Sequence, residues 1–155
     1  MSEASTLIQL LSAGRDDAVA ISAPSTPDLF YCGLREQISA TVKALRSVGL
    51  TPQDRVAIVL PNGPEMAVAF LAVASAVASA PLNPGYRAEE FEFYLTDLQA
   101  KALIVEADST SPAIEVAARL GTPILTCTRR PRRAPGASPW RPTGFRSETA
   151  RRRVR

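Results

Sequence analysis

The stretch VLPNGPEMAVAFLAVASAVASAPLNP, residues 59–84, decides the fold because it is almost uncharged and is bounded by proline turns. Pro61, Asn62 and Gly63 form a turn signal, and Pro64 suits the first position of a helix. Residues 66–80 number 15, which is about 22 Å at helical rise, whereas a bilayer core needs about 20 residues. The residues are mostly small, so we expect a helix packed closely against a sheet rather than a membrane span.

The segments that flank this stretch alternate between strand and helix patterns. Residues 56–60 and 101–105 are short apolar runs that fit strands covered on both faces. Between them, one helix face carries apolar residues at i, i+3, i+4 and i+7, namely Phe91, Tyr94, Leu95 and Leu98. A helix over residues 111–121 and a strand over 122–126 follow. This order predicts the α/β class, with a partial parallel sheet and helices on both of its faces.

The N-terminal third contains weaker signals of the same kind. Residues 6–14 read as a short helix that ends at a glycine, and residues 18–22 read as a strand. From Leu34 to Val48 apolar residues recur at helical spacing, and Gly49 follows as the expected stop.

Charge divides the chain into two parts. Residues 1–128 hold eight Lys and Arg against fourteen Asp and Glu, and residues 129–155 hold ten arginines against one acidic residue. The second part contains four prolines, no lysine and no apolar periodicity, so we expect it to be disordered. We therefore predict a domain over residues 1–128 and a basic Arg/Pro-rich tail over 129–155.

The tail has three interpretations. The favoured one is a shifted reading frame, because Arg, Pro, Ala and Gly have GC-rich codons and the composition changes abruptly after residue 126. The second is a nucleic-acid-binding arm, in which arginines neutralise phosphates and aromatic rings stack on bases; its residues would be Arg129, Arg130, Arg132, Arg133, Trp140, Phe145 and Arg151 to Arg153. The third is a non-specific linker.

Few side chains outside the tail suggest chemistry. Cys32 and Cys127 are far apart and the chain has no histidine, so a zinc site lacks ligands and both thiols fit a reducing compartment. The first 20 residues lack the features of a secretory signal, which predicts a cytoplasmic protein. The acidic residues Glu89, Glu90 and Glu92 fit a solvated helix face, Asp16 and Asp17 a loop, and Asn62 and Asn83 turns. We predict no catalytic, cofactor-binding or metal-binding residue.

Four blocks occur in a fixed order: LFYCGLREQ at residues 29–37, GLTPQDRVAIVLPNGPEMAVAFLAV at 49–73, APLNPGYRAEEFEFYL at 80–95 and AKALIV at 100–105. Together they resemble the opening part of the N-terminal domain of the adenylate-forming, AMP-binding acyl-CoA synthetases. The third block is similar to oxalate–CoA ligases and related small-acid ligases. Phe30 and Gly33 depart from the threonine and glutamate that the family usually has there.

The resemblance implies an activity for the family that this chain is not expected to perform alone. Members use ATP, Mg²⁺ and CoA to convert a carboxylate through an acyl-adenylate to an acyl-CoA, AMP and pyrophosphate. Their phosphate loop is a Ser/Thr/Gly-rich run that ends in Pro-Lys, and residues 1–155 contain no such run. We therefore expect an inactive ligase fragment that binds no cofactor, with the missing remainder of the ligase as its candidate partner. The alternative is a non-catalytic α/β binding module with a nucleic-acid-binding tail.

A shortened sheet has a predictable weakness. A parallel sheet is normally covered on both faces and continued at its edges. We expect an open strand edge at residues 124–126, an uncovered apolar patch and low solubility.

Overall fold

The structure is a computed structural model that describes residues 6–24, 26–127 and 146–148. Its centre is a five-stranded sheet in the order β4-β3-β5-β6-β7. The first four of these strands run parallel, and β7 pairs antiparallel with β6. The strands are β3 (Arg55–Val59), β4 (Ala78–Pro81), β5 (Ala102–Glu106), β6 (Ile124–Cys127) and β7 (Arg146–Glu148). The predicted α/β class with a parallel sheet is confirmed.

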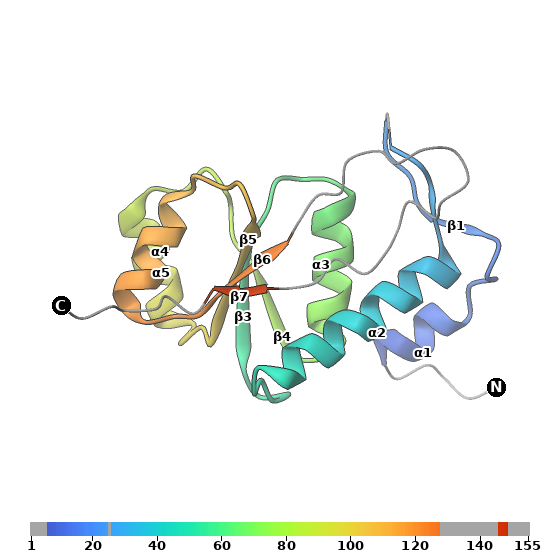
Figure 1. Ribbon diagram of the computed structural model, residues 1–155, viewed down its shortest axis with the longest axis horizontal. Coiled ribbons are helices and arrows are strands. Elements are labelled where there is room, and N and C mark those ends of the chain that lie inside the picture. The colour runs from blue at the N-terminus through green and yellow to red at the C-terminus, as the bar shows by residue number, and fades with distance from the viewer. Residues whose placement is uncertain (1–5, 25, 128–145, 149–155) are drawn as a thin grey trace.

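Helices cover both faces of the sheet (Figure 1). On one face lie α2 (Tyr31–Ser47) and α3 (Pro64–Ala74), and on the other lie α4 (Ala88–Asp97) and α5 (Pro112–Leu120). The side chains of β3 and β5 alternate between the two faces, so each strand contributes to two apolar clusters. This explains why both strands are continuous apolar runs in the sequence.

Helix α3 is buried from two directions. Ala69 and Val73 pack toward the sheet, whereas Val68 and Ala72 pack in a second cluster with Leu34 of α2. The apolar stretch is thus a helix held between a sheet and another helix. In the described part of the chain, no helix has the length and apolar character that crossing a membrane requires.

A small N-terminal unit packs on the outer side of α2. Helix α1 (Leu7–Ser12) begins at Thr6, whose side chain accepts a hydrogen bond from the Gln9 N–H at 3.2 Å. The strands β1 (Val19–Ile21) and β2 (Leu29–Phe30) form a separate antiparallel ribbon. The sequence predicted α1 and β1 but not β2, which has only two residues.

Two predicted element bounds were wrong. The helix expected over residues 66–80 ends at Ala74, and Ala78 begins strand β4. Helix α2 begins at Tyr31 rather than near Leu34, so Gly33 lies inside it. Glycine inside a helix costs up to about 1 kcal/mol relative to alanine.

The predicted open edge was also wrong. Residues 124–126 of β6 pair with β7, in the register Ile124 to Glu148, Leu125 to Ser147 and Thr126 to Arg146. Residues 146–148 therefore do not have the disorder expected for the tail as a whole. Residues 129–145 and 149–155 lie outside the described residues, so the rest of that prediction is untested.

Candidate functional site

A crevice of about 440 Å³ lies at the carboxyl ends of β3 and β5. The chain runs from β3 to its neighbour β4 on one side, and from β5 to β6 on the other. The two crossovers therefore diverge between β3 and β5, and such a switch point is where open parallel sheets bind ligands. Val59 ends β3 and Glu106 ends β5, and both line the crevice. Topology thus makes this crevice the candidate site.

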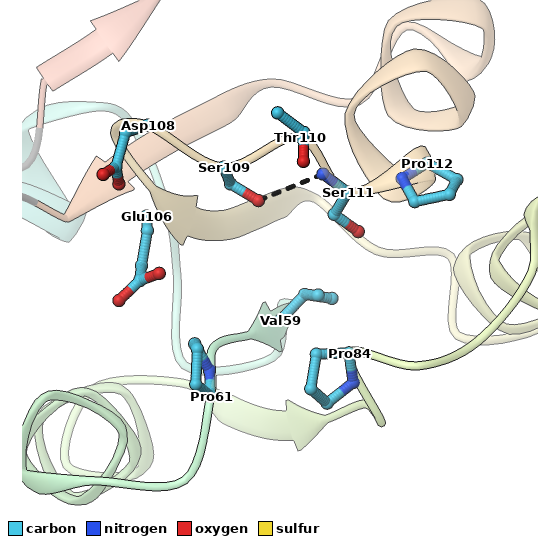
Figure 2. Close-up of a pocket in the computed structure, with 9 residues that line it drawn as sticks. All are labelled: Val59, Pro61, Pro84, Glu106, Asp108, Ser109, Thr110, Ser111 and Pro112. Carbon is cyan, nitrogen blue, oxygen red and sulfur yellow. Dashed lines mark hydrogen bonds between the residues drawn. The ribbon is translucent and has the colours of Figure 1, made fainter.

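Carboxylates and hydroxyls form most of its polar lining. Figure 2 shows Glu106 and Asp108 on the loop side of β5, followed along the chain by Ser109, Thr110 and Ser111. Pro61, which follows β3, and Pro84, which follows β4, line the opposite side. None of these residues was predicted from the sequence to belong to a site, although their place after buried strands was a usable signal.

The hydroxyls already serve helix α5. The Ser109 hydroxyl accepts a hydrogen bond from the Ser111 N–H, and the Ser111 hydroxyl accepts one from the Ala113 N–H, both at 3.2 Å. The N–H groups that a helix N-terminus could offer to an anion are therefore partly occupied. These contacts begin the helix and engage the N–H groups of Ser111 and Ala113.

The charge of the crevice also disfavours a triphosphate. Its nine lining residues include two carboxylates, Glu106 and Asp108, but neither lysine nor arginine. ATP binding in proteins relies on backbone N–H groups, cationic side chains and Mg²⁺ to offset the phosphate charge. Within the residues that the structure describes, no group of three or more His, Cys, Asp or Glu could hold a metal ion. The described lining of the crevice therefore offers no cationic side chain to a triphosphate.

Beside the crevice, Cys127 is a buried thiol in acidic surroundings. It ends β6 opposite Glu106 of β5, and 5 % of its surface is exposed. Burial raises its pKa to about 11, and the negative charges of Glu65 and Glu106 add to the increase. The thiol is therefore neutral near pH 7 and a poor nucleophile. Both Cys127 and Cys32 are free, and Cys32 is exposed.

Two of the acidic residues of α4, Glu90 and Glu92, have structural partners. The Glu90 carboxylate accepts a hydrogen bond from the Arg87 N–H at 2.8 Å, which helps to begin α4. Glu92 instead bonds to Arg119 of α5 at 2.7 Å. Glu89, Glu90 and Glu92 are all exposed, as expected for a solvated helix face.

The other polar residues considered from sequence also lie in local structure. Asp17 pairs with Arg15, and this ion pair lowers the pKa of the aspartate. Asp16 accepts a hydrogen bond from Arg35. The Asn83 side-chain oxygen accepts one from the Gly85 N–H at 2.9 Å, which fixes the turn after β4. All of the tail residues considered for nucleic-acid binding, including Trp140 and Phe145, lie outside the described residues.

The comparisons with known proteins define a class. The sequence profile of the family described as "AMP-binding enzyme" matches residues 11–143, and the chain belongs to this family. Among curated proteins it is similar to the oxalate–CoA ligase of Arabidopsis thaliana, at 37 % identity over 126 residues. It is also similar to the oxalate–CoA ligase of Saccharomyces cerevisiae, at 52 % identity over 59 residues, which is 37 % of this chain and 11 % of that one.

These likenesses cover only part of each relative. The Arabidopsis match includes 80 % of this chain but 24 % of the ligase. Among solved structures, apo MatB from Rhodopseudomonas palustris superposes with a TM-score of 0.69 and 25 % identity, over 79 % of this chain and 25 % of that one. The chain therefore spans about a quarter of the length of these two proteins.

Proposed function

We propose that residues 1–128 are a scaffold portion of an AMP-dependent carboxylate–CoA ligase. The family reaction joins a carboxylate to CoA at the expense of ATP, releasing AMP and pyrophosphate. The observation that carries this proposal is the match to CoA ligases along most of this chain but only about 24 % of the Arabidopsis ligase. Oxalate is the acid we favour for the complete enzyme, since two of the similar proteins are oxalate–CoA ligases.

We further propose that this chain does not catalyse the reaction alone and binds no ATP, Mg²⁺ or CoA. The supporting observation is the crevice, whose lining has two carboxylates and no lysine or arginine. The sequence also has no Ser/Thr/Gly-rich loop ending in Pro-Lys. Its partner would then be the remaining part of a ligase, which would supply the phosphate loop and the catalytic lysine.

We also propose that the protein is cytoplasmic. This proposal is supported by the two free cysteines, Cys32 and Cys127, because free thiols are typical of a reducing compartment.

An ATP–pyrophosphate exchange assay tests the absence of independent catalysis. The full chain is incubated with ATP, Mg²⁺, labelled pyrophosphate and either oxalate or another small carboxylic acid. We expect no acid-dependent exchange, because the crevice offers no cationic group for the phosphates. Acid-dependent exchange above a no-enzyme control would contradict the proposal.

Complementation tests the scaffold role. The chain is co-expressed with the part of the Arabidopsis oxalate–CoA ligase that follows the matched region. We expect exchange with oxalate that neither piece gives alone, and the same result when the chain is shortened to residues 1–128. Failure of both forms to complement, while each piece is folded and present, would contradict the scaffold proposal.

A further inference from the structure

At the outer edge of β6, the described residues of the basic tail, 146–148, meet the rest of the domain. The tail returns as β7 and pairs along residues 124–126. This pairing adds an antiparallel strand to four parallel ones. It therefore bears on how the chain behaves in solution, whatever the tail's origin.

Two backbone hydrogen bonds between β5 and β6 show which backbone groups of β6 face β5. The Leu103 N–H donates to the Pro123 carbonyl at 2.9 Å, and the Ala107 N–H donates to the Cys127 carbonyl at 3.0 Å. Pro123 and Cys127 thus direct their carbonyls toward β5, and the alternation of a strand places those of Leu125 there too. The backbone groups of Ile124 and Thr126 must then face β7.

The same alternation assigns roles within β7. Ile124 lies opposite Glu148 and Thr126 opposite Arg146, so these are the pairs that exchange backbone hydrogen bonds. Leu125 lies opposite Ser147 in a pair without hydrogen bonds, and the Ser147 N–H points away from β6. Each position of β7 can therefore be tested separately.

Without β7, the edge of β6 would be a template for association. The segment from Thr122 to Thr128 has no charged residue and includes the β-favouring sequence Ile-Leu-Thr. Unpaired edges of this kind pair with other chains. Strand β7 has only three residues, and its sequence Arg-Ser-Glu is charged at both ends, two features that natural proteins use to protect sheet edges.

We propose that β7 is an edge cap that prevents β6 of one copy from pairing with β6 of a second copy. The cap acts by occupying the backbone groups of Ile124 and Thr126. The outer edge of the sheet is then the short, charged strand β7 instead of the uncharged strand β6. The device does not depend on ligase activity.

The test compares the full chain with a chain ending at residue 145. In sedimentation velocity over a range of concentrations, we expect the full chain to be monomeric. We expect the shortened chain to form a dimer whose fraction rises with concentration. Hydrogen exchange at a concentration where both are monomeric should find the Ile124 and Thr126 N–H groups exchanging about tenfold faster without β7, as expected for the loss of a backbone hydrogen bond. The Leu125 and Cys127 N–H groups, which face β5, should change little.

Two proline variants of the full chain give a matched pair that keeps the tail. Glu148→Pro removes an N–H that donates to β6, whereas Ser147→Pro removes one that points away from it. Glu148→Pro should behave like the shortened chain, and Ser147→Pro like the unmodified one. The proposal is overturned if the shortened chain stays monomeric at all concentrations, or if Ile124 and Thr126 exchange equally fast with and without β7.

Discussion

At the scale of single residues, Cys127 links pH to stability. Its ordinary pKa of 9.0 rises to about 11 in the folded chain, so folding favours the neutral thiol. Its contribution is fully present below pH 9.0 and is lost as the pH rises through about 11. Urea denaturation gives the free energy of unfolding of the unmodified protein and of Cys127→Ala. We expect the difference between the two values to become smaller as the pH rises from 9.0 to about 11. A constant difference would contradict the assignment.

Arg35 is the second residue whose role can be measured. Its guanidinium donates hydrogen bonds to the carbonyl oxygens of Leu11 at 2.9 Å and Gly14 at 3.0 Å, and it pairs with Asp16. It thereby fastens the end of α1 to α2. Lysine has no planar fork to make these bonds together, so Arg35→Lys should lower the free energy of unfolding by about 1–2 kcal/mol.

The control for Arg35 lies on the same helix. Arg46 is exposed near the end of α2, so Arg46→Lys should leave the free energy of unfolding almost unchanged. Equal losses in the two variants, measured by urea denaturation, would show that the Arg35 contacts do not stabilise the protein.

At the scale of elements, α3 depends on small side chains. Ala72 is fully buried at 0 % exposure in the cluster shared with α2, whereas Ala74 on the same helix is only partly buried. Ala72→Leu should destabilise the protein by about 1–3 kcal/mol through overpacking, and Ala74→Leu should cost less. Thermal or urea denaturation of both variants measures this, and an equal or smaller loss for Ala72→Leu would refute the close packing of α3.

The elements also show which sequence signals were sufficient. Strands β3 and β5 were predictable because each is a continuous apolar run, and α5 because Ser111, Pro112 and Gly121 mark its ends. Most of strand β4 was assigned to the preceding helix, because Ala-Ser-Ala-Pro has no β-branched residue and continues the composition of α3. Its pairing with β3 overrides local propensity. The pairing of β7 depends on residues far apart in sequence, which periodicity does not report.

At the scale of the whole molecule, the candidate site follows from topology rather than from any motif. The crevice forms because β4 and β5 lie on opposite sides of β3. Sequence alone predicted a parallel sheet but not its strand order, so Glu106, Asp108 and Ser109 were not considered together. The predicted absence of a phosphate loop rests on the sequence, and the acidic lining of the crevice supports the scaffold proposal independently.

The central claim is that this portion of an AMP-binding enzyme provides structure without a site for the nucleotide. Calorimetric titration of the purified full chain with MgATP tests it most directly, with unfolding transitions recorded with and without MgATP as a second readout. We predict no saturable heat of binding and no shift in the unfolding midpoint, because ligand binding to the folded state would raise that midpoint. Saturable binding of MgATP accompanied by such a shift would contradict the account.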